Sequence, residues 1–364
     1  MDEEQYAENF NAAAESYYSA QDPRSQVEAL ESLVRLADSV QDVHGGYNAR
    51  MEMIQCATFA GLKDKALVAF TWCLAQSDKF PDVFDAHTLL WKFKWVLENI
   101  PNFLQVPKKK IYELQDDMQQ RLLAAGYNLR PVQFLRWTNA MRMGEFDRAA
   151  VYMEKWEQTS RDEMADCLAC EQNKLSEYFG RIGKLKQSDE TAAKLLDGRM
   201  TCAEIPHLTY GHLVPTYLKL GRSDELKKKH RAWYKLIKDN EEFLAPVSYH
   251  LLLVGGAGKY PAAIAMFERH APWAIKTVND THRFVFYSAA GLVFKHMAPS
   301  EPNIRMHVPS EFEFKRDDQS YDCAELSAWF LNEAKSLAAR FDQRNENGYY
   351  SELMSDAERL ISLI

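Results

Sequence analysis

The chain has 364 residues, 46% of them hydrophobic and 26% charged, with a formal net charge of −8. A chain of this length and composition can bury a large apolar interior, which excludes a disordered protein. Because the net negative charge repels phosphate backbones, we expect no nucleic-acid partner. Only 13 prolines and 15 glycines occur, and this low content favours long helices and predicts an all-α protein.

The first residues, Met1 to Gln5, carry neither the positive nor the apolar region of a signal peptide. No stretch approaches the roughly 18 uncharged apolar residues that a membrane-spanning helix needs. We therefore expect a cytoplasmic protein that does not contact a membrane. Six scattered cysteines are too few for a disulfide framework and are interpreted as reduced and mostly buried.

Two apolar stripes at helical spacing open the chain and predict two capping helices within residues 1–44. The first stripe consists of Tyr6, Phe10, Ala13 and Tyr17, and the second of Val27, Leu30, Leu33, Val34 and Leu36.

A short phrase then recurs, in which a glycine precedes a small or apolar residue and a new apolar stripe. It begins at Gly61, Gly144, Gly221 and Gly258, with a weaker copy at Gly183. Aligning the four clear copies gives three columns at spacings of four and three residues, which lie on one helix face. The columns are Ala66, Ala149, Leu226 and Ala263; Phe70, Met153, His230 and Phe267; and Cys73, Trp156, Trp233 and His270.

These columns resemble the centre of the tetratricopeptide repeat (TPR), over residues 45–275. The step from Gly61 to Gly144 spans two units, so a hidden unit is predicted within residues 82–126, with helices over 84–98 and 108–125. The resemblance implies one right-handed α-solenoid domain over residues 1–364, with about 16–18 helices in helical hairpins. Large residues such as Trp137 stand where the family prefers a small one, so ligand positions of the family are not carried over.

The C-terminal part, residues 276–364, is predicted to cap the array with further helices. A long non-helical insertion at 298–321 interrupts it. Apolar residues alternate with polar ones there, as in a hairpin or an extended arm. We expect the arm to be ordered, as a lid or a docking element, with Met306, Phe312 and Phe314 making its contacts.

The pair Cys167 and Cys170 has the spacing of a metal or redox motif, but residues 162–182 are predicted to form one long helix around it. A second cysteine pair is missing, and Cys202, His207 and His212 fall on different helical faces. We therefore expect buried structural cysteines, and neither a metal nor a cofactor. Basic residues at 227–238 form a stripe on a second helix, which is interpreted as a solvated face.

The first helix of each hairpin lines the concave surface in TPR-like arrays. Aromatic and polar residues on these helices are of the types that anchor protein interfaces. The predicted partner-binding residues are Arg50, Trp91, Lys94, Asn139, Arg142, Asn173, Arg181, Tyr210, His212 and Tyr249.

The predicted function is a scaffold or adaptor that holds a protein or peptide segment in this groove, without catalysis. One alternative is a regulator that senses a peptide or sequesters a partner. Another, from a different class, is an enzyme with a site around His212, His250 and Glu177.

Overall fold

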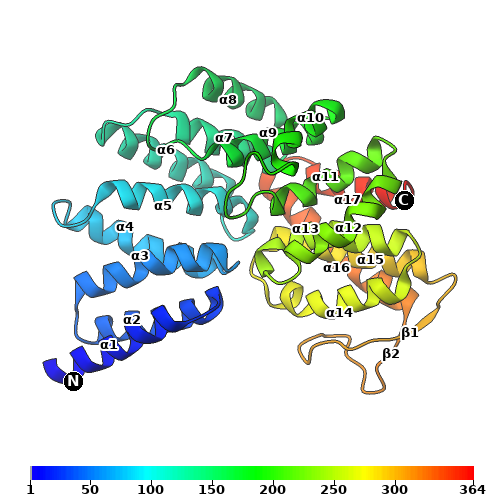
Figure 1. Ribbon diagram of the computed structural model, residues 1–364, viewed down its shortest axis with the longest axis horizontal. Helices are drawn as coiled ribbons and strands as arrows, with labels where there is room; N and C mark the ends of the chain where they lie inside the picture. The colour runs from blue at the N-terminus through cyan, green and yellow to red at the C-terminus, as the bar shows by residue number, and fades with distance from the viewer. Residues whose placement is uncertain (1) are drawn as a thin grey trace. The chain divides into compact units, whose positions relative to one another are not determined.

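The computed structural model describes residues 2–364, of which 74% are helical (Figure 1). Within this range the chain forms 17 α-helices that pack as consecutive antiparallel hairpins. None of these helices is long and apolar enough to cross a membrane. The chain divides into two compact units. Unit 1 comprises residues 2–100, 109–136 and 155–164, and unit 2 comprises residues 101–108, 137–154 and 165–364.

Unit 1 is built from the N-terminal helices, and each packs against the next from α1 to α5. These helices are α1 (Glu3–Ser19), α2 (Pro23–Ser39), α3 (Val43–Phe59), α4 (Lys63–Lys79), α5 (Ala86–Asn99) and α6 (Lys108–Ala124). Aspartates begin several of them, because a side-chain oxygen at the N-cap accepts hydrogen bonds from backbone N–H groups of the first turn. Asp22 does so for Arg24 and Ser25, and Asp85 does so for Thr88. The two helices of the hidden hairpin, α5 and α6, lie where the sequence predicts them.

The unit boundary falls within α7 (Arg130–Arg142) and α8 (Phe146–Gln158). Unit 2 continues with α9 (Leu168–Arg181), α10 (Leu185–Leu196), α11 (His207–Lys219), α12 (Ser223–Ile237), α13 (Leu244–Gly256), α14 (Tyr260–Lys276), α15 (Asp280–Met297), α16 (Cys323–Asn345) and α17 (Tyr349–Ile361). Alternate helices also contact one another in order, from α9 to α11, α13 and α15. The first helices of successive hairpins therefore form one packed row within this unit.

The glycines of the repeated phrase adopt the left-handed conformation that the sequence predicts for a turn between helices. Gly61, Gly144, Gly183, Gly221 and Gly258 all have φ between +68° and +79°. A side chain would be strained at such angles, whereas glycine tolerates them. The turns between the repeated helices are thus encoded locally.

The predicted inner face of the second helices is confirmed for two of the three columns. Ala66, Ala149, Leu226 and Ala263 are at most 2% exposed, and Cys73, Trp156, Trp233 and His270 are also buried. The middle column is mixed, because Phe70 and Phe267 are buried while Met153 and His230 are half-buried.

One helix prediction is wrong. Residues 162–182 do not form a single helix, because α9 begins only at Leu168 and Cys167 is its N-cap residue. The carboxylate of Asp162 accepts a hydrogen bond from the backbone N–H of Met164 at 3.0 Å. This local turn competes with a helix in the preceding residues.

The non-helical insertion between α15 and α16 is confirmed, and it contains a small antiparallel hairpin. Strand β1 (Asn303–Arg305) pairs with β2 (Ser320–Asp322), so that Ile304 lies opposite Tyr321. Met306 and Phe312 are buried in the apolar cluster of α14, α15 and α16, and Phe314 packs against it half-buried. Phe312 stacks on Phe330 of α16. These contacts pack the arm against its own unit.

Candidate functional site

A cavity of about 450 Å³ lies within unit 2, on the side of the first helices. Most of its wall comes from α9, α11, α13, α15 and the C-terminal helix α17. Polar and charged wall residues include Glu177, Arg181, His212, Lys219, Ser248, Tyr249, Ser288, Tyr349, Glu352, Asp356 and Arg359. Among the residues that the structure describes, the second helices α10, α12 and α14 contribute nothing to this wall. The cavity therefore opens on the row of first helices.

Glu177 is the central charge of the cavity and lies between two cations of its own helix. Its carboxylate is 2.8 Å from the guanidinium of Arg181 and 3.4 Å from Nζ of Lys174. Burial by itself would raise the pKa of Glu177, but the charges of Lys174 and Arg181 outweigh it and hold the pKa well below its usual range. Glu177 is consequently a carboxylate at neutral pH and balances the cations around it.

Helix α17 completes the wall through polar contacts to the first helices. Arg181 of α9 donates a hydrogen bond to the hydroxyl of Tyr349, and Lys219 of α11 lies 2.8 Å from the carboxylate of Asp356. Burial raises the pKa of Tyr349 to about 12, so this phenol stays protonated. The side chains of Arg181 and Lys219 remain 28% and 35% exposed, so solvent reaches both cations. The cavity thus presents charges of both signs beside aromatic rings.

His212 lines the cavity, and its Nε2 atom lies 3.1 Å from Oγ of Ser176. A serine next to a histidine can form a nucleophile and base pair. Here the hydroxyl of Ser176 is fully buried and also donates to the carbonyl oxygen of Ser188 at 2.9 Å. Burial lowers the pKa of His212 to about 4, so its imidazole is neutral near pH 7. The pair therefore holds α9 and α11 together rather than presenting a nucleophile to the cavity.

Three of the predicted partner-binding residues line this cavity, namely Arg181, His212 and Tyr249. Arg142 does not line the cavity; it is half-buried, and its charge helps to lower the pKa of Glu177.

The other predicted residues of unit 2 are buried among helices. Asn139 is fully buried, Asn173 accepts a hydrogen bond from Thr209 at 2.7 Å, and Tyr210 stacks on Trp233. In this conformation these three side chains pack within the unit.

In unit 1 the predicted residues form two cation–aromatic contacts. The Arg50 guanidinium lies 3.9 Å above the Trp72 ring and 2.7 Å from the carboxylate of Asp38. Nζ of Lys94 lies 3.5 Å above the ring of Trp91 and donates to the carbonyl oxygen of Met164 at 2.8 Å. Since Arg50 and Lys94 are both buried, these contacts stabilise the helix packing of unit 1.

The three residues of the predicted enzyme alternative do not come together. Glu177 and His212 both line the cavity, but His250 is fully buried, and its Nδ1 lies 3.1 Å from Nδ1 of His230 on α12.

Sequence reasoning missed the contribution of α17 to the wall. Tyr349, Glu352, Asp356 and Arg359 recur at three- and four-residue spacing beside the apolar stripe of this helix. That polar face is a usable signal in the sequence, whereas the apolar stripe alone predicts only a capping helix.

The structure brings Cys202 to Cys167 and Cys170, and it shows Cys167 exposed, so the prediction that these cysteines are buried is wrong for Cys167. These three residues could hold a metal ion, since their Sγ atoms all lie within 4.8 Å of one another. Hydrogen bonds from the thiols of Cys170 and Cys202 lower the pKa of Cys167 far below its usual range. The hydrogen bond to Cys167 raises the pKa of Cys170.

No family model matches the chain, and none of the curated proteins is significantly similar to it.

Proposed function

We propose that the chain is a TPR-like α-solenoid that binds a segment of a protein partner through the cavity of unit 2. The observation that carries this proposal is the composition of the cavity wall, which comes chiefly from first helices and α17. Repeat proteins of this kind bind partners along the surface that their first helices share. Repeated left-handed glycines in the turn between the two helices of a hairpin support the same architecture.

The chemistry of the wall favours a peptide as the ligand. Arg181 and Glu177 offer a cation and an anion, and both can exchange part of their mutual pairing for charges of an incoming segment. Tyr249 and Tyr349 add aromatic surface with a hydroxyl at one end, the residue type that anchors many interfaces. A cavity of about 450 Å³ accommodates one or two side chains of such a segment.

A binding role without catalysis agrees with the pairing of the ionisable groups. The hydroxyl of Ser176 is buried, and the imidazole of His250 is directed to His230. The groups that reach the cavity, such as Lys219 and Asp356, hold helices together.

Affinity capture from native lysate with quantitative mass spectrometry tests this proposal. The variant Arg181→Ala/Tyr249→Ala removes two side chains of the cavity wall. The matched control Arg231→Ala/Lys235→Ala removes two exposed residues of α12, a second helix outside the wall. We expect at least one protein that is retained by the wild type and the control but lost, by about tenfold or more, with the cavity variant.

The proposal would be contradicted if every captured protein bound equally to the wild type, the cavity variant and the α12 control. Circular dichroism must show the same helix content for all three proteins. Loss with the α12 control alone would place the binding surface on the second helices instead.

A further inference from the structure

We propose that Cys167, Cys170 and Cys202 bind one Zn²⁺ ion through their three thiolates. This inference is independent of the proposed partner binding, because none of the three cysteines lines the cavity of unit 2. In the described part of the chain, these are the three ligand-type side chains that gather closely enough to share an ion.

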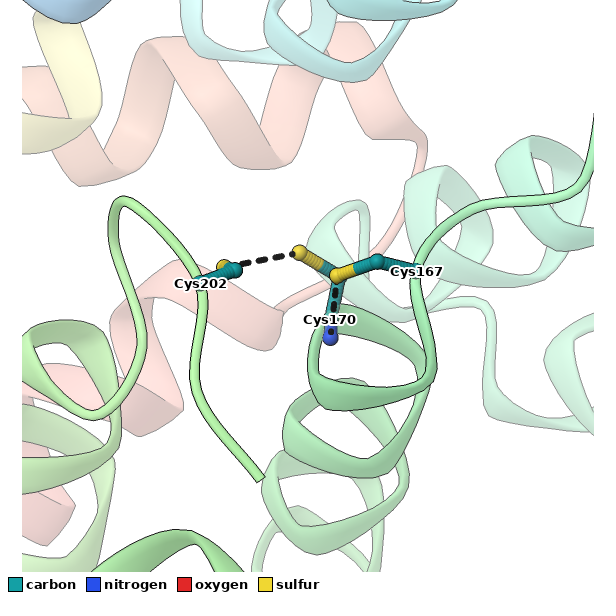
Figure 2. Close-up of side chains that lie close together, drawn as sticks. All are labelled: Cys167, Cys170 and Cys202. Carbon is teal, nitrogen blue, oxygen red and sulfur yellow. Dashed lines mark hydrogen bonds between the residues drawn. The ribbon is translucent and has the colours of Figure 1, made fainter. Parts of the chain in front are cut away.

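The spacing of the sulfurs suits one metal ion. A tetrahedral zinc site with Zn–S distances of about 2.3 Å places its sulfurs about 3.8 Å apart. Here Sγ of Cys170 lies 3.4 Å from Sγ of Cys202, and all three sulfurs lie within 4.8 Å of one another (Figure 2). The required value of about 3.8 Å lies between the 3.4 Å separation and the 4.8 Å limit. The 3.4 Å separation also exceeds the roughly 2.05 Å of a disulfide bond. All six cysteines of the chain are free thiols in this structure.

Two separate segments supply the ligands, and both are fixed. Cys167 is the N-cap of α9 and Cys170 lies in its first turn, whereas Cys202 lies in the loop between α10 and α11 (Figure 2). Cys170 and Cys202 pack against a small buried apolar cluster of Ala169, Leu195 and Ile205. The backbone N–H of Cys202 also donates to the carbonyl oxygen of Ile205 at 3.1 Å. The thiols are thus held together without the ion.

The surroundings stabilise the negative charge that three thiolates carry. The backbone N–H of Cys170 donates to Sγ of Cys167 at 3.3 Å. The sulfurs also lie at the N-terminus of α9, a helix of 14 residues, where the helix dipole favours anions. When Zn²⁺ binds, three Zn–S bonds form and the thiols release their protons to solvent, so the site becomes a monoanion.

Sulfur ligands select zinc over the hard cations Mg²⁺ and Ca²⁺, which require oxygen ligands. Three protein ligands leave one position of a tetrahedron for water or an external ligand. Cys167 is exposed, so an ion can enter from solvent.

The experiment uses the full chain, reduced and loaded with ZnCl₂ or CoCl₂ and then dialysed against metal-free buffer. We expect one zinc per chain by plasma mass spectrometry. The cobalt form should show thiolate-to-cobalt charge transfer in the near ultraviolet and the visible bands of a tetrahedral site.

Cys167→Ser, Cys170→Ser and Cys202→Ser should each lose the retained metal and most of the charge-transfer band. The exposed position of Cys167 makes its variant the least disruptive to folding. Cys56→Ser is the matched control, because Cys56 is half-buried like Cys170 and Cys202 but lies outside the cluster. It should keep one zinc per chain.

Three results would overturn the inference. The first is a reduced wild type that retains no zinc. The second is a folded Cys202→Ser variant that retains as much zinc as the wild type. The third is a Cys167–Cys170 disulfide that forms in air even with equimolar zinc present, as shown by thiol titration. None of these results bears on partner capture by the cavity variants, so the two proposals fail separately.

Discussion

Gly144, in the turn between α7 and α8, lies directly against Tyr349, the first residue of α17. A Cβ atom added to Gly144 would be only 2.4 Å from Cβ of Tyr349. Gly144 also has φ of +79°, so both backbone conformation and space require glycine there. The turn of one hairpin therefore sets how closely the C-terminal helix can approach within unit 2.

Replacing Gly144 by alanine should destabilise unit 2 more than the same change at Gly183. Gly183 has the same φ of +79°, but nothing lies within 4 Å of its added Cβ. Gly183→Ala should therefore cost only the left-handed strain, about 1–2 kcal/mol. Gly144→Ala adds the overlap with Tyr349, for a further 1–3 kcal/mol or so. Urea denaturation of both variants measures the difference, and equal costs would show that α17 does not pack as described.

Stability should fall steeply in mild acid because several histidines are buried as neutral imidazoles. Burial lowers the pKa of His270 to about 3, and its Nε2 lies 2.9 Å from the hydroxyl of Tyr234. Between pH 6.5 and about 3 the unfolded chain binds a proton at this residue and the folded chain does not. The contribution of the buried neutral imidazole to the free energy of unfolding is therefore fully present above pH 6.5, and it is lost as the pH falls towards 3.

His270→Gln should reduce this acid sensitivity. With an unfolded pKa near 6.5, one such histidine accounts for about 2–3 kcal/mol of the stability lost between pH 7 and 4.5. Urea titrations of wild type and variant at the two pH values give the change directly. His296→Gln, at an exposed position, is the control and should lose as much stability as the wild type. If His270→Gln loses as much stability between pH 7 and 4.5 as the wild type, the buried imidazole of His270 does not cause the acid sensitivity.

Phe312 should anchor the arm between α15 and α16. It is 3% exposed and contacts the rings of Trp329 and Phe330 of α16. Phe312→Ala should cost about 3–5 kcal/mol as a core truncation, and the half-buried Phe314→Ala markedly less.

Hydrogen exchange gives an independent measurement on the arm. The backbone N–H of Met306 donates to the carbonyl oxygen of Gln319 at 3.2 Å and should be protected in the wild type. Exchange of this amide within seconds in the wild type would show that the arm does not hold the packed conformation.

The sequence alone determined the helical class, the glycine turns and the non-helical insertion, because each depends on local properties. The three- and four-residue spacing of Ala66, Phe70 and Cys73 defines a helix face wherever the helix is placed. A glycine such as Gly221 permits a left-handed turn through its own lack of a side chain. Three prolines and the alternation around Ile304 likewise exclude a continuous helix at the arm without reference to distant residues.

Which side chains meet depends on how the helices pack in three dimensions. Cys202 joins Cys167 because the loop before α11 folds over the start of α9, and no local spacing encodes that approach. Asp356 reaches Lys219, 137 residues away, because α17 packs on the row of first helices. His212 of α11 lines the cavity, whereas His250 of α13 contacts His230 of α12. Such contacts depend on how amphipathic faces are shared among several helices, which is a property of the packed chain and not of any single segment.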